Sequence, residues 1–248
     1  MANWSDPRAA AAGFGAAAGT RDAAYDAGLR SYMLSVYNRM TSGVLLTGIV
    51  AMLFASGGAE SPAARILIGG GPLAWIIMLA PLGFVMAMSF GQNRMKTSTM
   101  SMLFWIFAVV MGLSLSTIFL QYTGTSVAGA FFSTAAAFAG LSLYGYTTKR
   151  DLAPLGTFLI MGLVGLIVAS LVNLFLQSGT MALVISAIGV LLFAALTAYD
   201  TQKIKSMYFE VRGTEFAGKA AIMGALTLYL DFINMFLFIL RLFGSSRD

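Results

Sequence analysis

The amino-acid sequence predicts an all-α polytopic membrane protein with seven transmembrane helices. Of its 248 residues, 58% are hydrophobic and only 10% are charged, whereas about a quarter of the residues in soluble domains are charged. The hydrophobic residues gather in seven runs, and each run is long enough to cross roughly 30 Å of hydrocarbon at about 1.5 Å per helical residue. A bundle of this size occupies nearly the whole chain, so we expect a single membrane domain.

Residues 1–30 are predicted to form a disordered cytoplasmic tail, and residues 31–248 the transmembrane bundle domain. The first 30 residues are rich in Ala and Gly, carry scattered charges and contain Pro7. No stretch of seven or more large apolar side chains precedes Met40, so we expect no signal peptide. The first helix would then act as its own targeting signal.

The seven predicted spans follow one another with short connections. The first run ends just before Glu60, the second opens at Pro72 and the fifth opens at Pro154. Lys or Arg residues follow the second, fourth and sixth runs. The spans cover approximately residues 40–59, 72–90, 101–121, 126–146, 154–177, 180–199 and 220–242.

The last run allows two interpretations. It carries Asp231 and Asn234 and ends at Arg241, and polar groups at this depth need a protein-lined or water-filled environment. It could cross the membrane completely. Alternatively, the protein has six spans and a re-entrant C-terminal helix that dips into a polar cavity.

The distribution of basic residues predicts that the N-terminus is cytoplasmic. Twelve of the fifteen Lys and Arg residues fall in the N-terminal tail and in the second, fourth and sixth connections, and three fall on the other side. Positive residues are enriched in cytoplasmic connections. The twelve are Arg8, Arg21, Arg30, Arg39, Arg94, Lys96, Lys149, Arg150, Lys203, Lys205, Arg212 and Lys219; the three are Arg65, Arg241 and Arg247.

The composition excludes several classes of function. The chain has no Cys and no His, which excludes disulfides, thiolate zinc sites and cysteine nucleophiles. Proton chemistry near neutral pH must therefore use carboxyl groups. Serine hydrolysis has no support, because Ser and Thr lack a His base and a Gly-x-Ser-x-Gly turn. We expect no enzymatic activity, no cofactor and no metal site. The net charge of +5 lies in short connections and does not indicate nucleic-acid binding.

Only two of the ten acidic residues, Asp200 and Asp231, lie in predicted spans. Each belongs to a stripe of small and polar residues with helical spacing, so the two stripes can face each other across the bundle. The stripe on the sixth run is Ser186, Gly189, Phe193, Thr197 and Asp200, and that on the seventh is Gly224, Thr227, Asp231, Asn234 and Phe238.

If the two carboxyl groups meet, they should share one proton, because two like charges in a poorly solvated site cannot both ionise cheaply. Such a pair would act as a proton switch. In the alternative interpretation, Lys203 neutralises Asp200 one turn away, while Asp231 stays protonated and bonds to Asn or Thr.

Several motifs in the chain resemble those of the Bax inhibitor family of membrane proteins, also called the transmembrane Bax inhibitor motif family. The similarity covers roughly residues 28 to 243 and is greatest with the bacterial branch that includes an inner-membrane modulator of the FtsH protease. The motifs are GLSLS at 112–116, FFSTA at 131–135, FAGLSLYGYTTKRDL at 138–152, GLVGLIVASLVN at 162–173, AYDTQK at 198–203 and LTLYLDFIN at 226–234.

The resemblance implies a seven-helix fold with the last helix central, located in the bacterial inner membrane. It also implies a pH-sensitive leak of calcium or other cations, in which Asp200 and Asp231 form the pH sensor and gate. Arg94 matches an arginine that latches the gate when the pore is closed, so protonation of the pair would release this latch. Candidates for polar groups along the pathway are Asn173, Asn234, Thr227 and Thr197.

One departure from the family pattern concerns calcium. Some members carry an acidic residue inside the second helix, whereas residues 72–90 contain none. A divalent hard cation prefers several charged oxygen ligands, so the departure argues against selectivity for calcium. Calcium and protons both remain possible transported ions.

Three functions remain open at this stage. The first is the pH-gated cation leak. The second is a non-transporting modulator of a membrane-bound AAA protease, with the N-terminal tail as the contact. The third is an intramembrane aspartyl protease, although the sequence around Asp231 lacks the Gly-x-Gly-Asp motif of that class.

Overall fold

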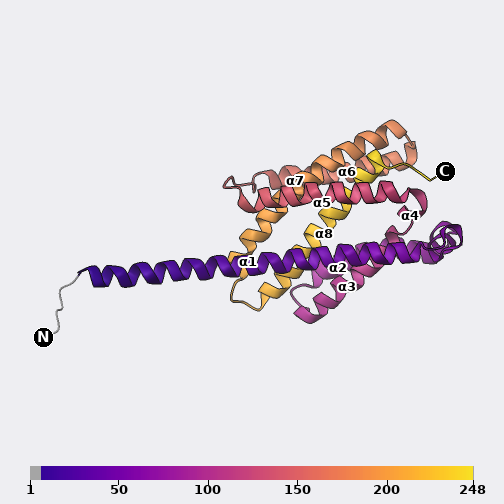
Figure 1. Ribbon diagram of the computed structural model, residues 1–248. Coiled ribbons are helices and arrows are strands. Elements are labelled where there is room, and N and C mark those ends of the chain that lie inside the picture. Colours follow the sequence, from indigo (N-terminus) through magenta and orange to yellow (C-terminus); the bar gives the residue numbers. More distant parts are fainter. Residues whose placement is uncertain (1–6, 248) are drawn as a thin grey trace.

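The computed structural model describes residues 7–247, and it describes side chains from residue 27 onward. The described chain is helical apart from short connections and one isolated β-bridge between Tyr122 and Ser246. Figure 1 shows an elongated bundle with the two chain ends at opposite ends. The elements are α1 (Pro7–Phe54), η1 (Gly58–Glu60), η2 (Ala64–Ile68), α2 (Pro72–Gly91), α3 (Thr97–Leu115), α4 (Ile118–Gln121), α5 (Gly124–Thr147), α6 (Leu155–Leu176), α7 (Gly179–Val211) and α8 (Phe216–Phe243).

Seven of these helices are long and apolar enough to span a membrane, so the predicted number of spans is confirmed. The spanning segments are Ala27–Phe54, Pro72–Gly91, Thr97–Gln121, Gly124–Thr147, Leu155–Leu176, Gly179–Val211 and Phe216–Phe243. The chain is therefore a multi-pass membrane protein with an all-α fold.

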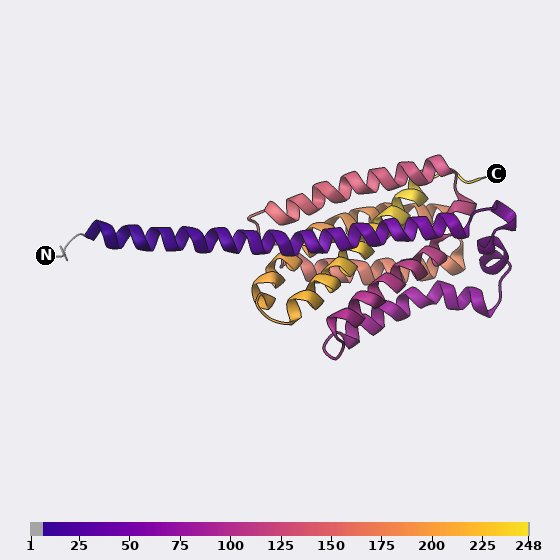
Figure 2. The same ribbon diagram turned by 60° about the horizontal axis from the view of Figure 1, so that its bottom comes forward.

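The last helix, α8, is the centre of the bundle. In its most apolar stretch 72% of the residues are buried, compared with 11% to 44% in the other six spans. It packs against α1, α3, α5 and α7, and Figure 2 shows it enclosed by these neighbours. Because α8 is continuous over 28 residues and runs the length of the bundle, the structure supports a full crossing rather than a re-entrant helix.

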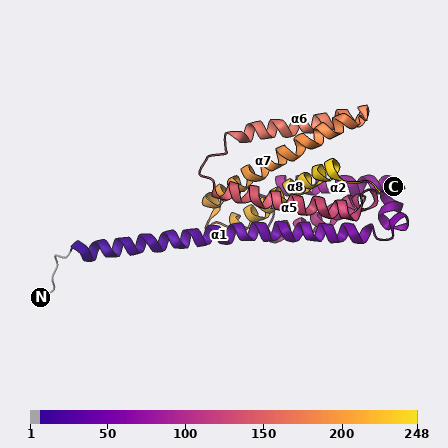
Figure 3. The ribbon, with the colours of Figure 1, turned by 45° about the horizontal axis from the view of Figure 1, so that its top comes forward.

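The outer helices have lipid-facing sequences. Only 11% of the most apolar stretch of α6 is buried, and this helix lies on the outside of the bundle beside α7 (Figure 3). Its exposed side chains include Phe158, Met161, Leu174 and Phe175. In water such a surface would be unfavourable, whereas in a bilayer it meets hydrocarbon.

Two helices continue beyond the predicted spans, which cover the bilayer-length apolar runs alone. Helix α1 extends well before residue 40, and Leu29, Met33 and Val36 form a buried stripe there that a continuous apolar run does not reveal. The helix α7 continues to Val211 rather than ending at Tyr199. Asp200 therefore lies inside a helix and not at its end.

The predicted disordered tail also differs from the structure. Helix α1 begins at Pro7, so residues 7–30 are helical and residues 1–6 lie outside the described chain. Ala has the highest intrinsic helix propensity, and this part of the chain is rich in Ala. Proline is also well tolerated in the first turn of a helix.

The residues that follow α8 are held against the connection between α4 and α5. The backbone N–H of Thr123 donates to the Ser245 carbonyl at 3.1 Å, and the Ser245 N–H donates to Ser126 Oγ at 2.9 Å. Arg247 donates through its backbone N–H to the Gln121 carbonyl and through its guanidinium to the Phe119 carbonyl, each at 2.8 Å. The C-terminal end of the central helix is thus fastened to the rim of the bundle.

Candidate functional site

The structure brings Asp200 of α7 and Asp231 of α8 into direct contact. Their side chains are in hydrogen-bonding contact with each other. Asp200 is 8% exposed and Asp231 is 4% exposed. A hydrogen bond between two carboxyl groups requires a proton on one of them, because an ionised carboxylate only accepts. The arrangement can therefore hold or release one proton between the central helix and its neighbour.

The two small-residue stripes bring these helices together, as the sequence predicts. A Cβ atom on Gly189 would lie only 2.6 Å from the Phe238 ring, so the absence of a side chain lets the ring approach the α7 backbone. The rings of Phe193 and Phe238 stack with centroids 5.9 Å apart. A Cβ on Gly224 would be 3.1 Å from Ile204. Close contacts above and below the pair fix the position of α7 against α8.

The surroundings of the pair provide little compensation for charge. Oδ2 of Asp231 is completely buried and receives no hydrogen bond from an amide, hydroxyl or basic group among the described residues. Lys203 is close enough to Asp200 to interact electrostatically, but no ion pair joins them within 4 Å in the described part of the chain. Buried polar atoms without partners are rare in folded proteins and often mark functional sites.

Three of the four polar candidates bond to carbonyls of their own helices. Thr197 and Thr227 donate to carbonyls of their own helices, those of Phe193 and Met223, at 2.7 and 3.1 Å. The Asn234 amide does the same with the Leu230 carbonyl. These side chains therefore satisfy their own hydrogen bonds within the helices.

Asn173 lies elsewhere, in a cavity of about 480 Å³ that Ser170, Ser186, Tyr122 and Arg241 also line. Its Oδ1 accepts a hydrogen bond from the Ser178 N–H at 3.1 Å, which helps to close the turn between α6 and α7. This cavity is near the C-terminal end of α8, several turns from Asp231, and includes neither aspartate.

Arg94 is not placed against the pair. It lies exposed in the turn between α2 and α3, where its backbone N–H donates to the Gly91 carbonyl. No ion pair connects it with Asp200 or Asp231 in the described chain. The latch suggested by the resemblance therefore stays a prediction.

Sequence reasoning missed a polar contact that anchors α8 just before Asp231. Thr47 of α1 donates to the Ala108 carbonyl of α3 at 2.8 Å, and its hydroxyl lies 2.7 Å from the Tyr229 hydroxyl. Because Thr47 donates to Ala108, Tyr229 is the donor to Thr47. Tyr229 is fully buried, with Phe104 and Phe107 packed edge-on against its ring. A lone Thr in an apolar run is too common a signal to reveal such a contact.

Comparison with known proteins adds an independent observation. The sequence model of a family described as "Inhibitor of apoptosis-promoting Bax1" matches residues 29–248. The chain belongs to the Bax inhibitor family. The resemblance predicted from the motifs is therefore confirmed, and the match begins within the first spanning segment.

Relatives within the Bax inhibitor family align over nearly their whole length. The uncharacterized protein RP147 of Rickettsia prowazekii is 47% identical over 229 residues, covering 92% of this chain and 95% of the relative. An uncharacterized protein of Caulobacter vibrioides is 43% identical, covering 92% and 93%. The inner membrane protein YbhL of Escherichia coli is 44% identical over 223 residues, covering 89% and 94%.

Proposed function

We propose that this Bax inhibitor family protein is a pH-sensitive cation leak of a bacterial inner membrane, gated by Asp200 and Asp231. The observation that carries the proposal is the direct contact between two buried carboxyl groups at the junction of the central helix with α7. The name of the relative YbhL supports the inner-membrane location. The excess of basic residues on one side supports a cytoplasmic N-terminus.

The geometry supports a gate that opens by charge repulsion. With one shared proton, the pair holds α7 against α8, and neither aspartate lines the cavities beside Tyr37, Asn173, Gln202 or Ser133. Loss of that proton would leave two like charges in contact. Two charges about 4 Å apart repel by roughly 4 kcal/mol at an effective dielectric constant of about 20, which is enough to shift α8. Flux should therefore increase as the pH rises.

The direction of the pH dependence distinguishes a gate opened by repulsion within the aspartate pair from a gate opened by release of the Arg94 latch. If protonation releases a latch, flux increases as the pH falls, and Arg94→Gln removes that response. If repulsion within the pair opens the gate, flux increases as the pH rises, and Arg94→Gln has little effect. The position of Arg94, exposed and away from the pair, favours repulsion.

Cation flux into proteoliposomes between about pH 6 and 8, the range that histidine normally covers, tests the proposal. We expect Asp231→Asn and Asp200→Asn each to flatten the pH response, because an amide cannot exchange the shared proton. Glu210→Gln is the matched control, since Glu210 is exposed on the same helix as Asp200. A wild-type flux that ignores pH, or the same response in all four proteins, would contradict the proposal.

Calcium is one permeant cation among others in this proposal. The described residues contain no group of three or more acidic, His or Cys side chains that could hold a metal ion, and α2 has no acidic residue. Selective binding of calcium normally uses six to eight oxygen ligands. We therefore expect comparable fluxes of calcium and monovalent cations.

A second candidate function is modulation of a membrane-bound AAA protease. The observation in its favour is the N-terminal part of α1, which projects as a helix well beyond the bundle (Figure 1). Deletion of residues 1–26 should leave cation flux intact and abolish inhibition of the protease. Unchanged inhibition in the truncated protein would exclude this helix as the contact.

The same pair of aspartates is proposed to be non-catalytic. An intramembrane aspartyl protease must admit water and a substrate backbone to its carboxyl groups, whereas Asp231 is only 4% exposed. Cleavage of a model transmembrane substrate by the wild-type protein, lost in Asp231→Asn, would overturn this assignment.

A further inference from the structure

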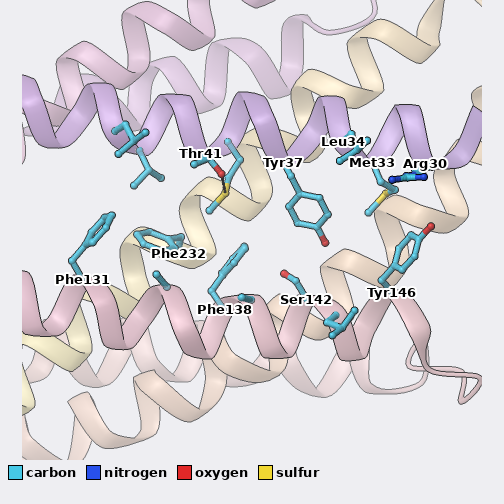
Figure 4. Close-up of a pocket in the computed structure, with 16 residues that line it drawn as sticks. Arg30, Met33, Leu34, Tyr37, Thr41, Phe131, Phe138, Ser142, Tyr146 and Phe232 are labelled. Atoms are coloured by element: carbon cyan, nitrogen blue, oxygen red, sulfur yellow. Dashed lines mark hydrogen bonds between the residues drawn. The ribbon is translucent and has the colours of Figure 1, made fainter.

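A long groove opens between α1 and α5 on the side of the bundle. Its volume is about 710 Å³, within the usual range of ligand sites of about 300 to 1,000 Å³. In Figure 4, α1 and α5 form its two walls, and the Phe232 ring of α8 lies between them. Phe131 and Phe138 pack edge-on against Phe232, each with centroids 5.6 Å apart. The floor of the groove is therefore aromatic.

The dimensions of the groove suit one hydrocarbon chain. Its lining on α1 extends from Arg30 to Leu45, a length of roughly 22 Å at about 1.5 Å per residue. One acyl chain from a single leaflet, about 15 Å deep, fits.

The lining is almost entirely apolar along most of this length. On α5, Ala135 and Ala139 leave the space that larger side chains would fill. Leu34, Leu45 and Leu143 line the groove while being 49%, 52% and 63% exposed, so the groove is open toward the surrounding hydrocarbon. A lipid can enter it sideways from the bilayer.

Positive charge gathers at one end of the groove. Arg30 and Tyr146 face each other across this end in Figure 4, whereas Phe131 is near the other. Lys205 of α7 stacks over the Tyr146 ring with Nζ 4.9 Å from its centroid, and it donates to the Tyr146 carbonyl at 2.7 Å. An ammonium group has three donors, so Lys205 keeps donors for a ligand. No carboxylate of the described residues lines the groove.

We propose that this groove binds one acyl chain of an anionic phospholipid, with the phosphate held between Arg30 and Lys205. The acyl chain gains little binding free energy when it moves from the bilayer hydrocarbon into an apolar groove. The headgroup therefore decides which lipid is bound. Each Lys or Arg near an anionic headgroup favours it by roughly fivefold. Two cations therefore favour an anionic over a zwitterionic lipid by more than about tenfold.

Lipid retention by the full-length protein tests the proposal without any flux measurement. The protein is extracted from bilayers containing equal amounts of phosphatidylglycerol and phosphatidylethanolamine, and the retained lipids are counted by native mass spectrometry. The wild type should retain one phosphatidylglycerol molecule with more than about tenfold preference. Ala139→Phe should lose this molecule, because the ring occupies the groove.

Two further variants control the experiment. Ala137→Phe places the same ring at an exposed position of α5 outside the groove and should retain lipid like the wild type. Arg30→Gln should reduce the preference for phosphatidylglycerol roughly fivefold, whereas Lys96→Gln, at an exposed position in the α2–α3 connection, should not change it.

Three outcomes would overturn the proposal. Equal retention in Ala139→Phe and Ala137→Phe would show that the lipid binds elsewhere. No preference for the anionic lipid in the wild type would remove the role of Arg30 and Lys205. A polypeptide that co-purifies in place of the lipid and is lost in Ala139→Phe would assign the groove to a protein partner.

Discussion

At the scale of single residues, the central helix is held by two polar contacts two residues apart. Asp231 meets Asp200 of α7, and Tyr229 donates to Thr47 of α1. The first contact depends on a proton and the second does not. Tyr229 therefore ties α8 to α1 and α3 whatever the state of the carboxyl pair, and it limits which part of α8 can move.

The Tyr229 contact makes a prediction about stability. Tyr229→Phe removes one donor and should cost about 0.5 to 1.5 kcal/mol of unfolding free energy in detergent. Thr47→Val should cost more, about 1 to 3 kcal/mol, because it leaves the buried Tyr229 hydroxyl without a partner. The double variant should regain part of that loss. Denaturant titration measures all three, and a Thr47→Val cost below that of Tyr229→Phe would refute the assignment of partners.

At the scale of helices, a few glycines decide how closely neighbours approach. A Cβ on Gly145 of α5 would collide with the carbonyl oxygen of Ala198 on α7, two residues before Asp200. Gly112 of α3 allows a similar approach to the Thr47 carbonyl, where a Cβ would lie 2.7 Å from the oxygen. By contrast, Gly140 of α5 has no atom within 4 Å of an added Cβ. Small size alone therefore does not identify a packing glycine.

The two glycines of α5 form a matched pair for experiment. Gly145→Ala should destabilise the protein by about 1 to 3 kcal/mol, since overpacking forces the α7 backbone to move. Gly140→Ala should be neutral or stabilising by up to about 1 kcal/mol, because Ala has the higher helix propensity. Thermal unfolding in detergent compares them. Equal effects of the two substitutions would contradict the packing described for α5 and α7.

At the scale of the whole molecule, an odd number of spans implies that the two chain ends lie on opposite sides of the membrane. The N-terminal end of the first span and the α2–α3, α5–α6 and α7–α8 connections then share one side. Twelve of the fifteen basic residues lie before or within the first half of the first span, in these connections, or in the helix ends next to them. The charge distribution and the helix count agree on one topology.

A reporter enzyme that is active only outside the cytoplasm tests this topology. Fused after Arg247, it should be active, and fused after Arg150, in the α5–α6 connection, it should be inactive. The second fusion serves as the control for orientation. An inactive reporter at both positions would mean that α8 does not cross the membrane.

The sequence predicted the features that depend on local pattern. Seven apolar runs gave the seven spans, and the helical spacing around Asp200 and Asp231 gave the two facing stripes. The full lengths of the helices α1 and α7 were not predicted, because buried and exposed positions alternate where each helix continues beyond its apolar run. The groove could not be predicted, since it depends on the separation of α1 and α5 in space.

The residues of the candidate site were also predicted only in part. The two aspartates were identified because so few acidic residues lie in spans. Tyr229 and Thr47 were not, because their contact joins residues 182 positions apart and neither residue is unusual in its own helix. Arg94 was assigned by resemblance, and its position in an exposed turn depends on a connection whose conformation the pattern does not specify.

The attachment of residues 245–247 to the α4–α5 connection sets the form of any motion of the central helix. That end of α8 is held by four hydrogen bonds, and the middle is tied to α1 through Tyr229. The end that begins at Phe216 has neither restraint. The part of α8 that can swing is then the segment from Phe216 to Leu228, pivoted at Tyr229, with its largest displacement at the basic side of the bundle. Asp231 lies between the two restraints, so its separation from Asp200 requires α7 to move away or α8 to turn about its own axis. An opening of this kind is wider at the basic side of the bundle than at the opposite side.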